Sequence, residues 1–276
     1  MDRPSSSRLR PTASNKRHRQ RIEEVVEEVQ EWVALKCLSH RQKIPHWQLN
    51  ESGRFRELVD KSNLSPLITA SYRSASKILV SCFVERWQPE TNTFHMPFGE
   101  MSISLDDVVT ILGILVSSRS VPYSGRMSFQ DAHSLPVDTL GVDPNEANDE
   151  LQQIRGQSVR LEWLRGRFSN ITDEDGNDMI DYAVRAYLLY LLGCTLFTDK
   201  TGTCVPIMYL TLLTNLERVR TYAWDAAALA YLYRQLGLAT RHEVKQIAGY
   251  LKLLEAWIYE HFECLASTLN IHYGVS

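Results

Sequence analysis

The sequence has few cysteines and no pair of them spaced as C-x-x-C. The five are Cys37, Cys82, Cys194, Cys204 and Cys264. An odd number argues against a disulfide framework, and the C-x-x-C pair of many zinc sites is absent. We therefore expect reduced, mostly buried thiols and predict no metal centre and no bound cofactor.

The sequence also lacks long hydrophobic runs and a strong excess of either charge. No apolar stretch approaches the length of a membrane span, and the N-terminus has no apolar signal-peptide core. The formal net charge is −3, whereas a dedicated nucleic-acid-binding domain is usually strongly basic. We expect a soluble, intracellular protein without a membrane contact.

Hydrophobic residues make up 44% of the 276 positions, enough for the core of one large or two small domains. We predict a helical domain over residues 22–268, between a disordered basic tail at 1–21 and a flexible C-terminus at 269–276. The tail contains KRHRQR at 16–21. Such a run fits a nuclear-localisation signal, a weak non-specific nucleic-acid contact or a plain solvated tail.

The stretch 85–116 predicts a small β-hairpin near 93–104 that leads into a helix. TFHM at 93–96 and MSIS at 101–104 flank a turn at Pro97-Phe98-Gly99. Ser104 and Asp107 have the spacing of a capping box, and Gly113 stands where the helix would end.

Apolar residues at helical spacing dominate the rest, so the predicted fold class is mainly α. A long loop over about 118–150 is predicted from its Pro, Gly, Asp and Asn content. A short strand is an option at 114–121. Helices are expected near 22–38, 67–87, 151–168, 180–197, 226–236 and 244–265.

Three blocks carry a resemblance to a known family. They are ERWQPETNTFHMPFGEMSISLDDVVTILGI at 85–114, RAYLLYLLG at 185–193 with TLF and DK just after it, and YAWDAAALAYLYR at 222–234. Together they resemble the plant mobile domain, also called the aminotransferase-like plant mobile domain. Fifteen residues carry the motif: Trp87, Pro89, Phe94, His95, Pro97, Gly99, Glu100, Asp107, Gly113, Arg185, Tyr187, Gly193, Phe197, Trp224 and Tyr231.

The resemblance implies a domain of transposon origin, like that of maintenance-of-meristems-like proteins and phosphatase-seven long-form homologues. It implies a nuclear location, with the cytoplasm left open, and a Ser/Thr phosphatase partner of the plant phosphatase-seven type. It also implies roles in gene silencing and meristem maintenance. The family's domain ordinarily continues beyond the block matching 255–261, so a C-terminally shortened copy is expected.

Three functional classes remain open from the sequence. The first is a non-enzymatic interaction module; if its interface lies near the hairpin, Phe98→Ala disrupts it. The second is a DNA-associated protein that uses the basic tail. The third is an enzyme: a pyridoxal-phosphate enzyme needs a suitably placed lysine, and Lys77 and Lys200 do not stand in such a setting.

Four titratable residues of the hairpin stretch are close enough in sequence to suggest an acid–base set: His95, Glu100, Asp106 and Asp107. The simpler interpretation is a histidine on the hairpin and carboxylates at the start of a helix. No catalytic residue is predicted. Arg185, in a strongly apolar helix, is expected to pair with a carboxylate.

Overall fold

The computed structural model describes residues 34–38, 47, 53–70, 75–114, 117–121, 127–154, 157–172, 174–241, 243–262 and 265. The chain divides into two compact units, residues 1–34 and 35–276. Only Ala34 of the first unit is described, so the predicted basic tail and most of the helix at 22–38 lie outside the described residues. The predicted flexible C-terminus at 269–276 lies outside them as well.

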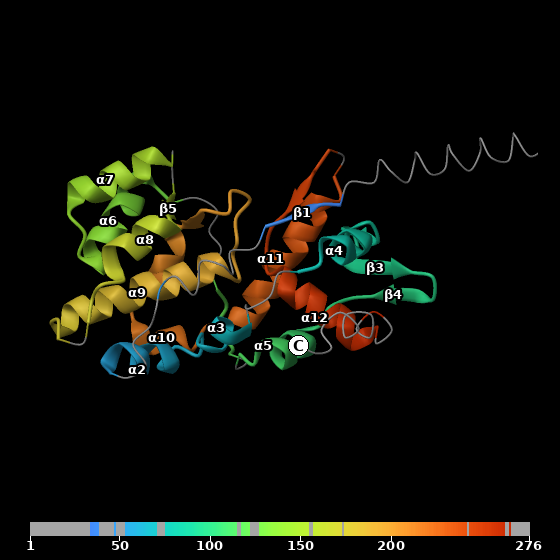
Figure 1. The fold of residues 1–276 in the computed structure, drawn as a ribbon, viewed down its shortest axis with the longest axis horizontal. Coiled ribbons are helices and arrows are strands. Elements are labelled where there is room, and N and C mark those ends of the chain that lie inside the picture. The colour runs from blue at the N-terminus through green and yellow to red at the C-terminus, as the bar shows by residue number, and fades with distance from the viewer. Residues whose placement is uncertain are drawn as a thin grey trace, which may run out of the picture. The chain divides into compact units, whose positions relative to one another are not determined.

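The second unit is mainly α, as predicted (Figure 1). Its described strands are two to four residues long. The helices are α2 (Arg54–Lys61), α3 (Pro66–Ala70), α4 (Lys77–Val84), α5 (Leu105–Leu112), α6 (Phe129–Leu140), α7 (Pro144–Gln153), α8 (Leu161–Phe168), α9 (Asn177–Cys194), the 3₁₀ helix η2 (Ile207–Leu212), α10 (Leu216–Val219), α11 (Trp224–Ala239) and α12 (Leu251–His261).

The strands form three small sheets. β1 (Lys36–Cys37) pairs in parallel with β7 (Gln246–Ile247), and β5 (Ser158–Arg160) pairs antiparallel with β6 (Cys204–Pro206). The predicted hairpin is present as β3 (Thr93–Met96) and β4 (Gly99–Met101), with Phe94 opposite Met101. A third strand, β2 (Trp87–Gln88), extends this sheet on the β3 side.

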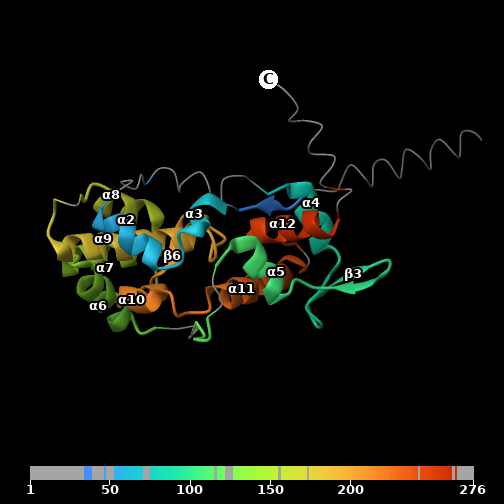
Figure 2. The same ribbon diagram turned by 90° about the horizontal axis from the view of Figure 1, so that it is seen from below.

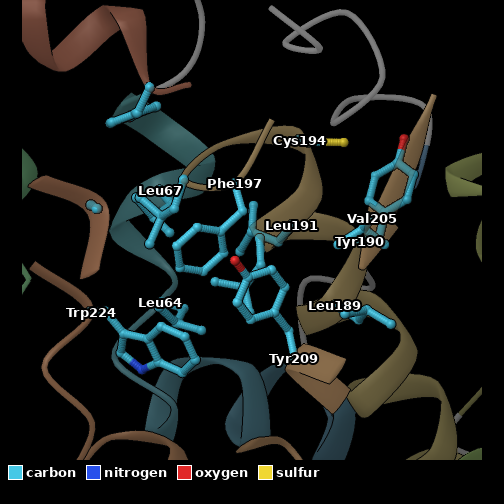
Figure 3. Packing of buried hydrophobic residues seen from close by; sticks show 14 of the residues in the cluster. Leu64, Leu67, Leu189, Tyr190, Leu191, Cys194, Phe197, Val205, Tyr209 and Trp224 are labelled. Atoms are coloured by element: carbon cyan, nitrogen blue, oxygen red, sulfur yellow. The ribbon is translucent and has the colours of Figure 1, made fainter. Parts of the chain in front are cut away.

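The helix α9 is the centre of the core. It contacts α2, α6 and α8, and these helices lie around it in two perpendicular views (Figures 1 and 2). Side chains at its C-terminal end meet residues from η2, α11 and the chain around α3 (Figure 3). The Phe197 ring stacks on Tyr209 at a centroid distance of 4.2 Å, and Trp224 lies 6.4 Å from Phe197. Apolar faces of helices distant in sequence are thereby buried together.

The helix α5 begins and ends as the sequence predicts. The Ser104 hydroxyl accepts a hydrogen bond from the Asp107 amide at 3.1 Å, and the Asp107 carboxylate accepts one from the Ser104 amide at 2.7 Å. This reciprocal pair is a capping box. Gly113 ends the helix with φ 63°, a left-handed conformation that glycine adopts without steric cost.

The predicted long loop at 118–150 is wrong, because it contains α6 and the first part of α7. The residues that suggest a loop instead mark helix ends. Ser128 caps α6, Gly141 ends it at φ 63°, and Asp143 caps α7 with Pro144 in its first turn. Each residue type is favoured at that helix boundary for the reason that makes it common in turns.

Several predicted helix bounds are also wrong. The stretch 67–87 contains the separate helices α3 and α4, and 151–168 contains the end of α7, β5 and α8. The helix predicted to stop before Gly237 continues to Ala239, α12 starts only at Leu251, and residues 36–37 are in a strand. Of the strand considered at 114–121, the described residues show only a bridge between Arg119 and Tyr222.

Candidate protein-interaction surface

An aromatic cluster fixes the hairpin sheet on the domain. Trp87, 2% exposed, lies 4.8 Å from Phe94 between ring centroids, and Phe94 stacks on Trp257 of α12 at 5.3 Å. Phe83 of α4 packs edge-on against both Phe94 and Trp257. The side chains that pin the sheet therefore come from β2, β3, α4 and α12, so the turn between β3 and β4 has a defined place.

That turn presents an apolar side chain to solvent. Phe98 is 69% exposed although it is a large aromatic residue, and its ring is tilted against that of Phe262, with ring centroids 6.3 Å apart. Gly99 follows with φ 133°, which L side chains rarely adopt, so the turn requires glycine there. The motif residues Pro97 and Gly99 thus shape the turn that holds Phe98 out.

A groove of about 550 Å³ runs beside Phe98. One wall is α4, another is the hairpin turn, and a third is the end of α12. Ile78 on the α4 wall is 64% exposed, although its place in an apolar helical period predicts a core residue. The groove is lined mainly by apolar side chains: Ile78, Leu79, Cys82, Phe83, Met96, Pro97, Phe98, Phe262 and Leu265, with Ser76, Arg86 and Tyr259 as its polar members.

A buried carboxylate joins two walls of the groove. Glu255 of α12 is 5% exposed and accepts a hydrogen bond at 2.7 Å from the amide of Ser76, the N-cap of α4. Its oxygens also accept from the Lys252 ammonium and from the Tyr259 hydroxyl. Burial, followed by the nearby Glu255 charge, raises the pKa of Tyr259 to about 12, so this phenol is a neutral hydrogen-bond donor at physiological pH.

The four residues of the possible acid–base set do not form one. His95 and Glu100 are exposed cross-strand partners on the hairpin, and Glu100 accepts a hydrogen bond from the Thr93 hydroxyl. The Asp107 carboxylate is held by the capping box, and Asp106 is exposed in the first turn of α5. The set therefore consists of two hairpin surface residues and two helix-start carboxylates.

The motif residues of α9 and its C-terminal turn are structural. The ring of Tyr187 is buried beside Trp47 and Phe55 at 5.4 and 5.9 Å. Gly193 lies so close to β6 that an added Cβ would come within 2.6 Å of the Val205 Cβ. Phe197 belongs to the stack with Tyr209 (Figure 3).

The predicted carboxylate partner of Arg185 is wrong for the part of the chain that the structure describes. Its Nη1 donates instead to the backbone carbonyl of Thr139 at 3.2 Å, and its guanidinium lies over the Tyr182 ring at 5.8 Å. Its buried Nε has no hydrogen-bond partner among the described residues. Arg185 ties α9 to α6 through the backbone of α6.

The motif residues of α11 are held by backbone carbonyls. The Trp224 indole donates to Val219 at 2.9 Å, and the Tyr231 hydroxyl donates to Thr198 at 3.0 Å. Pro89 of the hairpin region lies beside Gly237 of α11, where an added Cβ would meet the Pro89 Cβ at 3.7 Å, an ordinary contact. These residues fix the frame on which the groove is built.

Other chemistry is sparse among the described residues. They contain no group of three or more His, Cys, Asp or Glu side chains that could hold a metal ion, and none of their helices is long and apolar enough to cross a membrane. Cys37, Cys82, Cys194 and Cys204 form no disulfide among the described residues; two of them are buried and two are partly buried. Cys264 lies outside the described residues.

The sequence of the hairpin suggests an interface at Phe98 but does not predict the groove beside it. Its other lining residues include Ile78 and Cys82 on successive turns of α4, Arg86 shortly after that helix ends, and Phe262 and Leu265 after the end of α12. The available signal was the i, i+4, i+8 spacing of 78, 82 and 86, which places them on one face of a helix. An apolar helix face predicts a core position, so this spacing alone does not reveal a groove.

The fold and the surface together define a helical domain with an apolar groove beside a hairpin that an aromatic cluster holds in place. The chain belongs to the plant mobile domain family, whose model matches residues 65–272. No solved structure matches it.

Three relatives are proteins of Arabidopsis thaliana. "Protein MAIN-LIKE 1" is 37% identical over 88% of this chain and 46% of its own length, and "Protein MAINTENANCE OF MERISTEMS" is 35% identical over 84% and 47%. "Serine/threonine-protein phosphatase 7 long form homolog" is 36% identical over 66% of this chain and 13% of its own length. The chain therefore spans less than half the length of each of these relatives.

Proposed function

We propose that the chain is a non-enzymatic protein-interaction module of transposon origin. It acts in the nucleus with a Ser/Thr phosphatase of the plant phosphatase-seven type, in transcriptional and transposon silencing and in meristem maintenance. The observation that carries the interaction role is the apolar groove with Phe98 and Ile78 exposed at its rim. Exposed apolar surface of this kind is typical of protein-binding sites.

Two features of the groove support a role as a docking site for a protein segment. Its walls are held together by the Glu255 hydrogen bonds and by the aromatic cluster around Phe94, so it exists before a partner arrives. Its exposed anchor is an aromatic residue on a rigid turn, the type of side chain that most often dominates binding energy.

The biological part of the proposal draws on the relatives. One is named for the maintenance of meristems, and another is named as a long-form homologue of a Ser/Thr phosphatase. The region similar to this chain makes up 13% of the second protein. A region of this type is therefore part of a longer protein that is named as a phosphatase homologue. That association favours a phosphatase as the partner of the separate chain.

The test is direct binding of the purified chain to a purified phosphatase of this type. Phe98→Ala is the informative variant, and Phe129→Ala is the matched control, because Phe129 is 54% exposed on α6 and does not line the groove. We expect Phe98→Ala to weaken binding by about tenfold or more, as for an aromatic hot spot, while Phe129→Ala leaves it unchanged.

Both variants should unfold at the same temperature as the parent chain, since each removes a mainly solvated side chain. A folded Phe98→Ala chain that binds the phosphatase as tightly as the parent would show that the groove is not the docking site. Failure of the parent chain to bind the phosphatase at all would remove the partner from the proposal. The tagged chain should also be purified from nuclear extract. Its recovery without any Ser/Thr phosphatase would argue against a phosphatase partner in cells.

A further inference from the structure

The hairpin turn is both a projection and one wall of the groove. In two perpendicular views, the β3–β4 hairpin extends beyond α4 and α12 (Figures 1 and 2). Phe98 at its turn is 69% exposed and also lines the groove, and Ile78 on the α4 wall is 64% exposed. A protruding aromatic side chain and an apolar hollow therefore lie side by side on one surface of the chain.

A surface that carries a projection beside a hollow is complementary to itself. When two copies meet across a two-fold axis, each contributes the same patch, so every contact between two residues is made twice. Phe98 of each copy would then enter the groove of the other and cover Ile78 there. The groove has room for it, because its volume is about 550 Å³, whereas an apolar cavity of about 150 Å³ is enough for a benzene ring.

The charges beside the projection and beside the hollow have opposite signs. Glu100 lies two residues after Phe98, is exposed, and accepts a hydrogen bond from the Thr93 hydroxyl at 3.1 Å. Among the described residues that line the groove, Arg86 alone carries a charge; it is exposed and donates from Nη1 to the Cys82 carbonyl at 2.9 Å.

Neither Glu100 nor Arg86 forms an ion pair with another residue of the described ranges. The two-fold contact that seats Phe98 in the partner groove also brings Glu100 of one copy toward Arg86 of the other. Opposite charges on the two sides of an interface select the correct partner and fix its register. The charges therefore favour a second copy of this chain as the occupant of the groove.

We propose that this chain forms a two-fold dimer in which Phe98 of each copy packs between α4 and α12 of the other and Glu100 pairs with Arg86 across the interface. The contact is small. Two phenylalanine and two isoleucine anchors bury less than about 1,000 Å², and interfaces below about 1,200 Å² are typical of weak, transient association. The dimer should therefore dissociate on dilution.

This inference goes beyond the proposed function, because the dimer covers the surface to which a phosphatase segment would bind. Self-association and partner binding then compete for Phe98 and the groove. The test below uses no phosphatase, so failure of the dimer and failure of the phosphatase proposal are distinguishable.

Sedimentation velocity of the purified full chain over about a hundredfold range of concentration measures the association. We expect monomer at the low end and dimer at the high end. Phe98→Glu should weaken dimerisation by about tenfold or more. The matched control, Phe129→Glu, places the same charge at a side chain that is 54% exposed on α6 and does not line the groove, and it should leave dimerisation unchanged.

Three results would overturn the proposal. The first is a chain that stays monomeric over the whole range, and the second is a folded Phe98→Glu chain that dimerises as well as the parent. The third is growth into trimers and larger species, because a head-to-tail contact does not close at two copies.

Charge reversal tests the pairing across the interface. Glu100→Arg and Arg86→Glu should each weaken dimerisation by about tenfold or more, because each places like charges opposite one another in both halves of the contact. Mixing the two variants should restore association, since every charged contact in the mixed pair joins opposite signs. The double variant Glu100→Arg with Arg86→Glu should dimerise like the parent chain.

Circular dichroism and thermal unfolding establish that each variant is folded. Folded single variants whose mixture does not associate would refute the pairing of Glu100 with Arg86, as would single variants that dimerise like the parent. If Arg86→Glu unfolds because it loses the bond to the Cys82 carbonyl, the comparison of Phe98→Glu with Phe129→Glu decides the proposal by itself.

Discussion

Gly193 and Gly166 are both inside helices, and alanine should have opposite effects at the two positions. At Gly193 of α9 an added Cβ would lie 2.6 Å from the Val205 Cβ and 2.9 Å from a Leu161 methyl carbon. At Gly166 of α8 it would meet nothing within 4 Å. The Val205 Cβ is bonded to the backbone of β6, which is paired with β5, so it cannot rotate away from the new methyl group.

The expected magnitudes follow from two opposing terms. Alanine in place of glycine in a helix contributes up to about 1 kcal/mol, and this term acts alone at Gly166. Overpacking of a close-packed site costs about 1–3 kcal/mol, and at Gly193 it opposes the same gain. We expect Gly166→Ala to raise the free energy of unfolding slightly and Gly193→Ala to lower it by up to about 2 kcal/mol, with the melting temperature falling by about 2–4 °C for each kcal/mol.

Urea denaturation followed by tryptophan fluorescence measures both effects, with the denaturant slope compared to confirm that the same surface is exposed on unfolding. A Gly193→Ala chain as stable as the parent would mean that α9 and β6 can separate at no cost. The close approach would then not explain the glycine. If Gly166→Ala destabilised the chain, the comparison of open and closed sites would fail.

Three further predictions concern single side chains. Ser104→Ala should cost about 0.5–2 kcal/mol in the urea assay because it removes the cap of α5, and an unchanged stability would mean that the capping box contributes nothing. Glu150→Ala should cost about 1–3 kcal/mol of unfolding free energy, because Glu150 is 2% exposed and accepts hydrogen bonds from both the amide and the guanidinium of Arg160. The exposed Glu57–Lys61 pair is the control, and Glu57→Ala should have no measurable effect on stability. Equal losses of stability in the two variants would refute the role of burial. Burial raises the pKa of Cys37 to about 11 from a usual value of 9.0. The thiol therefore ionises first in the unfolded chain, and the stability that it contributes below pH 9 is lost as the pH rises toward 11. Cys37→Ser should flatten the dependence of unfolding free energy on pH in this range, and an unchanged slope would contradict the pKa shift.

The features that the sequence predicts correctly depend on neighbouring residues. The hairpin and the start and end of α5 need only the turn at Pro97-Phe98-Gly99, the Ser104 and Asp107 pair, and Gly113. Each is a backbone or capping requirement that acts over a few residues, and the structure has all three. The mainly α fold class likewise follows from the apolar period within single segments.

The errors arise where a local signal has two meanings. Gly141, Asp143 and Pro144 predict a loop when read together, yet in the structure they are the end of one helix and the start of the next. Gly237 predicts a helix end, but α11 continues through it to Ala239. Only the three-dimensional neighbours decide between these meanings, and they lie far away in the sequence.

The groove is the clearest example of this limit. The apolar face of α4 predicts a core helix, and Val80, Phe83 and Val84 are indeed buried, while Ile78 on the same helix is exposed. The helix α4 therefore has more apolar surface than its described neighbours cover. Periodicity identifies an amphipathic helix, but it does not show which part of a wide apolar face meets the core and which part meets another chain segment.

The site's rigidity comes from motif and non-motif residues acting at opposite ends of the groove. At one end, Glu255 bonds to the backbone amide that starts α4, where the helix dipole favours a negative charge. At the other, Phe83 of α4 lies against Phe94 of the motif and Trp257 of α12. The relative positions of α4, α12 and the hairpin are therefore set before anything binds, and the ordering cost of binding falls on the occupant alone.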